Sequence, residues 1–168
     1  MYKDVQITDY IDIVHQRLSK GGVFLTAKSN SETNTMTIGW GGITYFWNKP
    51  IFIVPVRASR HTYKFIDNAD EFTVSVPIDV DLKKALLFCG SRSGRDVNKY
   101  EESGLITFPG RVIETPIIKQ CELHYECKIV YRQPMDPSLL CQDIEERFYP
   151  DYHTMFYGEI ISNYLVRN

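Results

Sequence analysis

The segment Asn34-Thr35-Met36-Thr37-Ile38-Gly39-Trp40 is the stretch around which the rest of this chain is organised. Its apolar side chains, Met36, Ile38 and Trp40, recur at every second position, which predicts a strand with these three on one face. The opposite face then carries two threonine hydroxyls and a glycine. Glycines at positions 39, 41 and 42 remove side chains beside Trp40, which leaves room for a large flat group against the backbone. An ordinary sheet strand that ends in a glycine turn would explain the same residues.

Length and composition favour one compact unit without a nucleic-acid or membrane partner. The 168 residues suit a single domain, 1–168, with a real hydrophobic core. The formal net charge of −2 gives no electrostatic reason to expect nucleic acid or an anionic membrane. Aromatic residues make up 13% of the chain and include 11 tyrosines, whose apolar ring and polar tip suit interfaces and ring-stacking sites.

The four cysteines, Cys89, Cys121, Cys127 and Cys141, have no C-x-x-C spacing, so we expect no metal site and no thioredoxin-like chemistry. The N-terminus lacks the apolar run of a signal peptide, and no later stretch is apolar enough to span a bilayer. These features together predict a cytoplasmic protein with reduced thiols.

Hydrophobic periodicity predicts six strands with helices between them. The strands are expected over residues 23–28, 34–40, 51–54, 72–76, 121–132 and 153–166. Helices are expected from Thr8 or Asp9, from Ser59 toward Asn68, from Asp79 or Asp81, and from Asp96. Residues 45–50 should form an aromatic loop, and residues 133–152 a longer loop with a helical turn. This order favours an antiparallel barrel over a parallel sheet, and neither a Rossmann nor a P-loop motif is present.

The clearest alternation lies in the strand over residues 121–132. It predicts a long antiparallel strand that is half buried, with one apolar face and one polar face. The expected buried face contains Cys121, Leu123, Tyr125, Cys127, Ile129 and Tyr131, and the polar face contains Glu122, His124, Glu126, Lys128 and Arg132.

The segment Arg57-x-Ser59-Arg60-x-Thr62 is a candidate anion site. With Ser59 as the cap of a helix, the free amides of the first turn would point toward a phosphate. Two arginines and two hydroxyls would add charge-assisted hydrogen bonds, and His61 would lie at the rim. The plainer alternative is a capped surface helix with solvated arginines.

Four segments, taken in order, resemble the flavin reductase family. They are N-x-M-T at 34–37, R-x-S-R-x-T at 57–62, C-G-x-x-S-G-R-D-x-x-K at 89–99 and H-x-x-x-x-G-E-I at 153–160. The resemblance spans residues 21–160, although residues 48–50 and 133–152 depart from the family pattern. It implies an all-β fold with peripheral helices, an antiparallel Greek-key split barrel, that forms a homodimer with FMN near the subunit interface.

The resemblance also implies a set of cofactor-binding residues. Asn34, Thr35, Met36 and Thr37 would border the isoalloxazine ring, with Trp40 close by. Arg57, Ser59, Arg60 and Thr62 would hold the phosphate. Cys89, Gly90, Ser93, Gly94 and Lys99 would border the ribityl and phosphate end.

The activity that this resemblance implies is an NAD(P)H-dependent flavin oxidoreductase, which passes a hydride from NADH or NADPH through bound FMN to a flavin or another acceptor. One alternative is a flavoredoxin-like FMN electron carrier reduced by a protein partner, and another is a non-catalytic FMN-binding module. His153 either acts in catalysis, by binding nicotinamide or relaying a proton, or is a solvent-facing residue at a strand end. Cys89 is a redox partner to the flavin or, as the better interpretation, a small buried filler.

Overall fold

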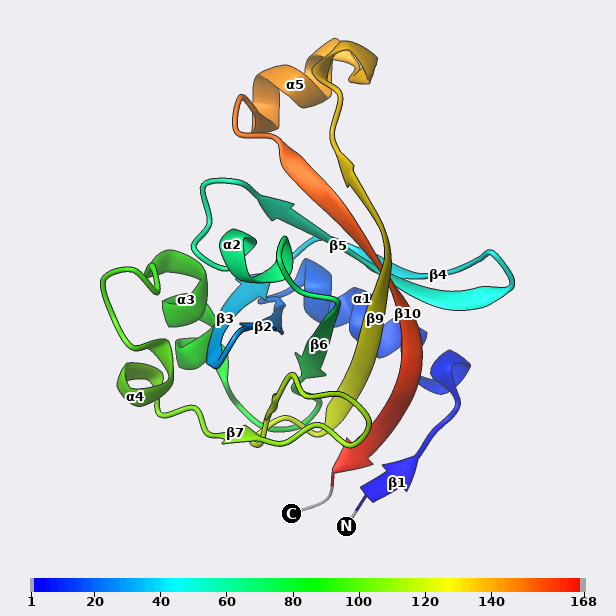
Figure 1. Ribbon diagram of the computed structural model, residues 1–168, viewed down its shortest axis with the longest axis vertical. Helices are drawn as coiled ribbons and strands as arrows, with labels where there is room; N and C mark the ends of the chain where they lie inside the picture. Colours follow the sequence, from blue (N-terminus) through cyan, green and yellow to red (C-terminus); the bar gives the residue numbers. More distant parts are fainter. Residues whose placement is uncertain (1, 167–168) are drawn as a thin grey trace.

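The computed structural model describes residues 2–166 and consists mainly of one antiparallel sheet curled into a barrel (Figure 1). The sheet has eight strands in the order β3-β2-β6-β9-β10-β5-β4, with β1 paired to β10. These strands are β1 (Tyr2–Asp4), β2 (Val23–Ser29), β3 (Glu32–Ile38), β4 (Gly42–Phe46), β5 (Lys49–Arg57), β6 (Glu71–Val76), β9 (Leu123–Pro134) and β10 (His153–Val166). A separate pair is formed by β7 (Thr107–Phe108) and β8 (Ile117–Ile118).

The barrel is split because β3 and β4 are the two ends of the strand order and are not paired with each other. The expected antiparallel split barrel is therefore confirmed. Short helices surround the barrel: η1 (Ile7–Tyr10), α1 (Ile11–Ser19), α2 (Tyr63–Ile66), α3 (Lys83–Ser91) and α4 (Lys99–Ser103). The helix α1 buries Val14 and Leu18 in the main core, and α3 lies along β3 (Figure 1).

The expected aromatic loop over residues 45–50 is instead the tight end of a hairpin between β4 and β5. Trp47 and Asn48 alone separate the two strands, and both have positive φ, 54° and 56°. This backbone geometry matches a two-residue turn whose twist suits a hairpin, and asparagine tolerates it well. A tryptophan at such a position is unusual, so the sequence did not indicate the turn.

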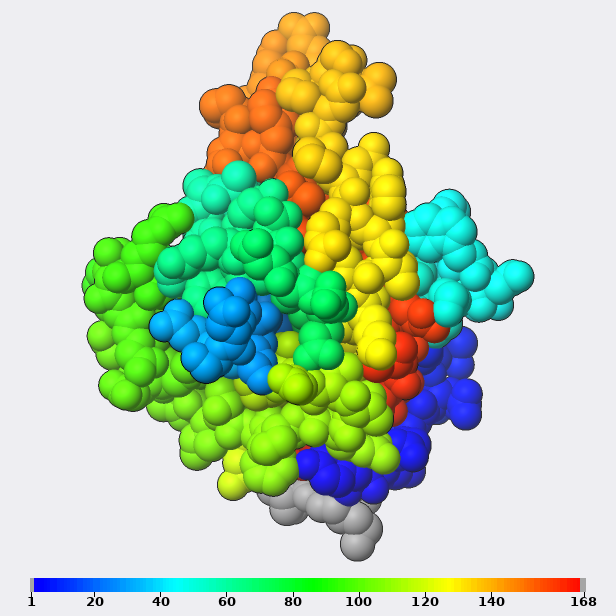
Figure 2. All heavy atoms as spheres, in the orientation of Figure 1, coloured from blue at the N-terminus to red at the C-terminus, as the bar shows by residue number. Residues whose placement is uncertain are grey.

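The expected loop over residues 133–152 is also more ordered than predicted. Strands β9 and β10 continue past the barrel and support a lobe, residues 135–152, that contains η2 (Pro137–Leu139) and α5 (Gln142–Phe148). The lobe projects from one end of the molecule (Figures 1 and 2).

The polar face predicted for β9 is wrong at two positions. His124 and Glu126 are fully buried, because the segment that contains β7 and β8 covers this face of the strand. Glu126 accepts hydrogen bonds from the amides of residues 111–113, and His124 contacts the hydroxyl of Ser75 at 3.0 Å. The alternation also breaks at a register shift opposite residues 157–158, so that Tyr131 is 42% exposed.

Two further features of the described residues bear on function. Within residues 2–166, no helix combines the length and hydropathy needed to cross a membrane. The same residues contain no cluster of three or more His, Cys, Asp or Glu side chains that could hold a metal ion.

Candidate functional site

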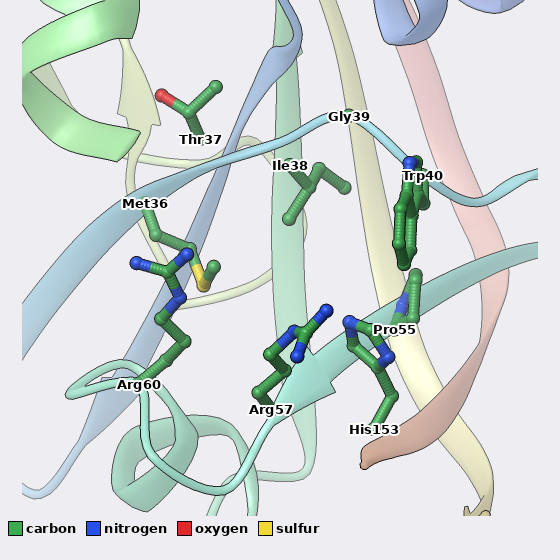
Figure 3. Close-up of a pocket in the computed structure, with 9 residues that line it drawn as sticks. All are labelled: Met36, Thr37, Ile38, Gly39, Trp40, Pro55, Arg57, Arg60 and His153. Carbon is green, nitrogen blue, oxygen red and sulfur yellow. The ribbon is translucent and has the colours of Figure 1, made fainter. Parts of the chain in front are cut away.

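Two adjoining cavities lie between the end of β3 and the end of β5. The first, here called the aromatic cavity, has a volume of about 190 Å³ and is lined by the nine residues labelled in Figure 3. The second, here called the cationic cavity, has a volume of about 340 Å³. Met36, Arg57 and Arg60 line both cavities, which makes them one continuous groove. The two ends of this groove differ strongly in chemistry.

Trp40 forms one wall of the aromatic cavity. It follows β3 and is 45% exposed, whereas Met36 and Ile38 are buried, but all three side chains line this cavity and point the same way (Figure 3), as the period-two pattern predicts. Its ring lies 5.3 Å from the ring centroid of His153, and Arg57 points up between these rings and Met36 (Figure 3). The result is a slot with apolar sides and polar atoms at its floor.

His153 belongs to the wall of this slot and does not face solvent. The residue is 7% exposed, and Nδ1 of its ring lies 3.0 Å from the hydroxyl of Tyr149. Burial, aided by the nearby positive charge of Arg57, lowers the pKa of His153 to about 4. The imidazole is therefore neutral at pH 7, with one nitrogen held by Tyr149.

The cationic cavity takes its charge from side chains. Arg57, Arg60, Arg92, Arg95 and Lys99 line it, together with the hydroxyls of Ser59, Thr62, Ser91 and Ser93. Among the described lining residues, the one carboxylate is Asp151. Several guanidinium groups around one concave space favour an anion such as a phosphate.

The helix start predicted at Ser59 is wrong. Residues 57–63 form a turn in which the amide of Arg60 donates to the carbonyl of Arg57, and α2 begins only at Tyr63. The Ser59 hydroxyl donates to Oδ2 of Asp151 at 2.5 Å, so it caps no helix. The sequence could not indicate this contact, because its acceptor comes from a distant segment. The residues predicted for the anion site still line the cavity, but through side chains.

Arg57 attaches the lobe to the barrel. Its guanidinium donates to the carbonyl oxygens of Asp151 at 2.8 Å and Phe148 at 3.0 Å. It also lies 6.0 Å from the ring centroid of Trp40 and 5.5 Å from that of Tyr149. Arg60 is exposed and spans both cavities, with one hydrogen bond to the carbonyl of Gly90. Of the two arginines, Arg60 is therefore freer to bind a ligand.

Several predicted site residues support the groove without lining it. Thr35 is fully buried and bonds to Thr26, while the Asn34 amide donates to the Thr62 hydroxyl at 2.7 Å. Asn34 and Gly94 line a different, third cavity of about 480 Å³. Gly90 lies in α3 against Thr37, where an added Cβ would come within 3.4 Å.

Lys99 connects β3 to α3 at the floor of the cationic cavity. Its ammonium group is buried and donates to the carbonyl oxygens of Thr35 and Cys89, both at 2.9 Å. Burial lowers the pKa of Lys99 and raises that of the Cys89 thiol. Cys89 is therefore a buried thiol, as the plainer interpretation predicts, and its backbone carbonyl is the part that holds Lys99.

The prediction from sequence missed the contribution of the lobe. Asp151 lines the groove, while Phe148 packs against Trp40 and Tyr149 against His153. The run of aromatic residues before Pro150 was the one signal in the sequence. Arg92 and Arg95 lie within the third motif and line the cationic cavity, although the resemblance does not imply a role for them.

A model of the flavin reductase like domain matches residues 15–168. One curated relative is an uncharacterized protein from Archaeoglobus fulgidus, which is 28% identical over 82% of this chain and 68% of its own length. Another is an uncharacterized protein from Pyrococcus abyssi, which is 25% identical over 78% of this chain and 65% of its own length. This chain thus spans about two thirds of their length.

Solved structures agree with this match. Flavoredoxin from Methanosarcina acetivorans is 29% identical with a TM-score of 0.64, and the alignment covers 85% of this chain and 67% of that one. An FMN-binding domain of a flavin reductases-like enzyme from Shewanella baltica has a TM-score of 0.68 at 20% identity, over 98% of this chain and 77% of the other. The second likeness is one of fold alone.

Proposed function

Since this chain belongs to the flavin reductase like domain family, we propose that it binds FMN and acts as an NAD(P)H-dependent flavin oxidoreductase. The acceptor would be a free flavin or another small molecule. We place the activity in the cytoplasm, in keeping with four cysteines that are all free.

The observation that carries this proposal is the continuous groove with one aromatic and one cationic end. Its chemistry fits FMN, which has a flat ring system at one end and a phosphate at the other. Met36 and Trp40 would contact the ring, and Arg60, Arg92 and Arg95 would hold the phosphate. Bound FMN would supply a ring that accepts a hydride and returns electrons singly or in pairs.

His153 supports a role for this chain in positioning the electron donor. As a neutral imidazole fixed by Tyr149, it can donate or accept one hydrogen bond in the aromatic cavity without adding charge there. A catalytic role for His153, with NADH or NADPH as donor, is the part of the proposal taken from the resemblance.

A second candidate function is an electron carrier like flavoredoxin, reduced by a protein partner. The 29% identity to the Methanosarcina acetivorans flavoredoxin favours it. A second observation is that the aromatic cavity has a volume of only about 190 Å³, with Trp40 fixed from the other side by Phe148 of the lobe. Little space is then left for a nicotinamide ring beside a flavin.

The test is an absorption spectrum of the purified protein, followed by NADH and NADPH oxidation with and without added FMN. We expect a flavin spectrum after FMN is added and oxidation of one nicotinamide that depends on the protein. Stable FMN uptake without nicotinamide oxidation would favour the electron carrier. A protein that never takes up FMN would refute both functions.

A further inference from the structure

The carboxylate of Asp151 lies inside the cationic cavity, among the groups expected to hold a phosphate. Its Oδ2 accepts the hydrogen bond of the Ser59 hydroxyl at 2.5 Å. Five cationic side chains line the same cavity. The carboxylate therefore stands where an oxygen of a phosphate monoester would otherwise accept the same bond.

We propose that Asp151 is an internal competitor for the cofactor phosphate, and that phosphate binding displaces it and loosens the lobe from the barrel. This inference rests on the proposed FMN-binding function. It assigns a specificity role to Asp151: only a ligand with a phosphate group removes the carboxylate from Ser59, whereas a flavin without phosphate leaves it in place.

The contact at Ser59 is one that a phosphate can replace. A hydroxyl has a single proton to donate, so it cannot serve the carboxylate and a phosphate oxygen at the same time. Asp151 is held there by a neutral donor, and no ion pair joins it to an arginine in the part of the chain that the structure describes. A phosphate dianion, in contrast, can form several charge-assisted bonds with the surrounding guanidinium groups. Two anions side by side also repel each other, which favours departure of the carboxylate.

Displacement of Asp151 would change the aromatic cavity as well, because a short chain of contacts connects Asp151 to Trp40. The backbone carbonyl of Asp151 is one of the two lobe carbonyls bound by Arg57, and the other belongs to Phe148. Phe148 in turn packs against Trp40. The lobe projects from the barrel on the two strands β9 and β10 (Figures 1 and 2), and these contacts near the groove attach the segment before β10 to the barrel. Phosphate binding would therefore widen the slot at Trp40.

The first experiment compares flavin affinities in Asp151→Asn and the wild type. We expect Asp151→Asn to bind FMN about tenfold more tightly, because the competing charge is gone, and to bind riboflavin within about twofold of the wild type. Asp143→Asn, on the exposed first turn of α5, is the matched control and should change neither affinity. Asp151→Ser gives the same test if the asparagine variant does not fold. Unchanged or weaker FMN binding in both variants would overturn the inference.

The second experiment follows the lobe directly by hydrogen exchange of peptides from residues 136–150. In the wild type, saturating FMN should speed exchange in these peptides, and riboflavin should not. Equal or slower exchange with FMN would contradict the coupling. If neither the wild type nor Asp151→Asn binds FMN, the proposed function itself fails. If the wild type binds FMN and the variant binds it no better, only this inference fails.

Discussion

Trp40 and Phe148 meet edge to face, with ring centroids 5.3 Å apart and planes at 89°. The contact joins a residue two positions after the end of β3 to the last residue of α5, so the lobe supports Trp40, which lines the aromatic cavity, without lining the cavity itself. Edge-to-face pairs of this kind stabilise by about 0.5–1.5 kcal/mol beyond the area they bury. The lobe is therefore held closely enough to shape the slot, yet weakly enough to move.

Trp40→Ala tests the aromatic end of the groove. We expect it to weaken FMN and riboflavin equally, by about tenfold or roughly 1.4 kcal/mol, because both ligands share the ring that Trp40 contacts. Phe108→Ala, which removes an exposed aromatic residue on β7, is the control. Titration by flavin fluorescence quenching measures both affinities. A loss confined to FMN would place the ring elsewhere.

Arg60→Ala tests the cationic end. Loss of a charge-assisted bond costs about 1.5–3 kcal/mol, and the exposure of Arg60 favours the lower end, or roughly tenfold in FMN affinity. Riboflavin lacks the phosphate, so its affinity should hardly change in this variant. The same titration gives both values. If the two ligands weaken equally, Arg60 supports the fold and the phosphate assignment is wrong.

The hairpin between β4 and β5 predicts self-association. Its tip exposes Tyr45 by 70%, Phe46 by 53% and Trp47 by 51%, and it projects from the body of the molecule (Figure 2). Exposed aromatic side chains in one place are typical anchors of protein interfaces. We expect a homodimer by light scattering, and a shift toward monomer in Phe46→Asp. Leu87→Asp, at a 74% exposed position on α3, should remain dimeric. A wild type that is monomeric while fully loaded with FMN would contradict the prediction.

Local patterns were enough to predict β6 and most of β2, β3 and β10, although β6 and most of β2 are buried on both faces. These patterns failed where a side chain is buried by, or bonded to, residues distant in the sequence. Glu126 is buried because the amides of residues 111–113 reach it, and Ser59 caps no helix because Asp151 takes its hydroxyl. The motifs indicated Met36, Arg60 and Lys99 at the groove, but contacts formed by the lobe depend on tertiary folding that no local pattern encodes.

Cys89 is predicted to be dispensable for electron transfer. Its thiol is buried, burial raises its pKa, and the nearby Lys99 binds its backbone carbonyl, which any residue supplies. Cys89→Ala should therefore keep nicotinamide oxidation within about tenfold of the wild type, or roughly 1.4 kcal/mol of barrier. Stopped-flow reduction of the loaded protein measures it. Complete loss of reduction, with FMN still bound, would give the thiol a redox role.

His124 predicts how the folded state responds to acid. Its buried ring contacts Ser75, and burial lowers its pKa from 6.5 to about 4, although the hydrogen bond to the carbonyl of Cys121 opposes the shift. Between these two values the unfolded chain binds a proton at this side chain and the folded chain does not. The contribution of His124 to the free energy of unfolding should therefore be fully present above pH 6.5. It should fall as the pH drops toward 4, by up to about 1.4 kcal/mol per pH unit.

The matched variants for this prediction are His124→Gln, which removes the titrating group, and His15→Gln at an exposed position on α1. His153 also has a lowered pKa and adds to the acid sensitivity of all three proteins. The quantity compared is therefore the slope of the free energy of unfolding against pH. Urea unfolding at pH 7, 6 and 5 should give a shallower decline for His124→Gln than for the wild type and His15→Gln. Three equal slopes would mean that His124 takes up its proton without unfolding the barrel, through movement of the segment that contains β7 and β8.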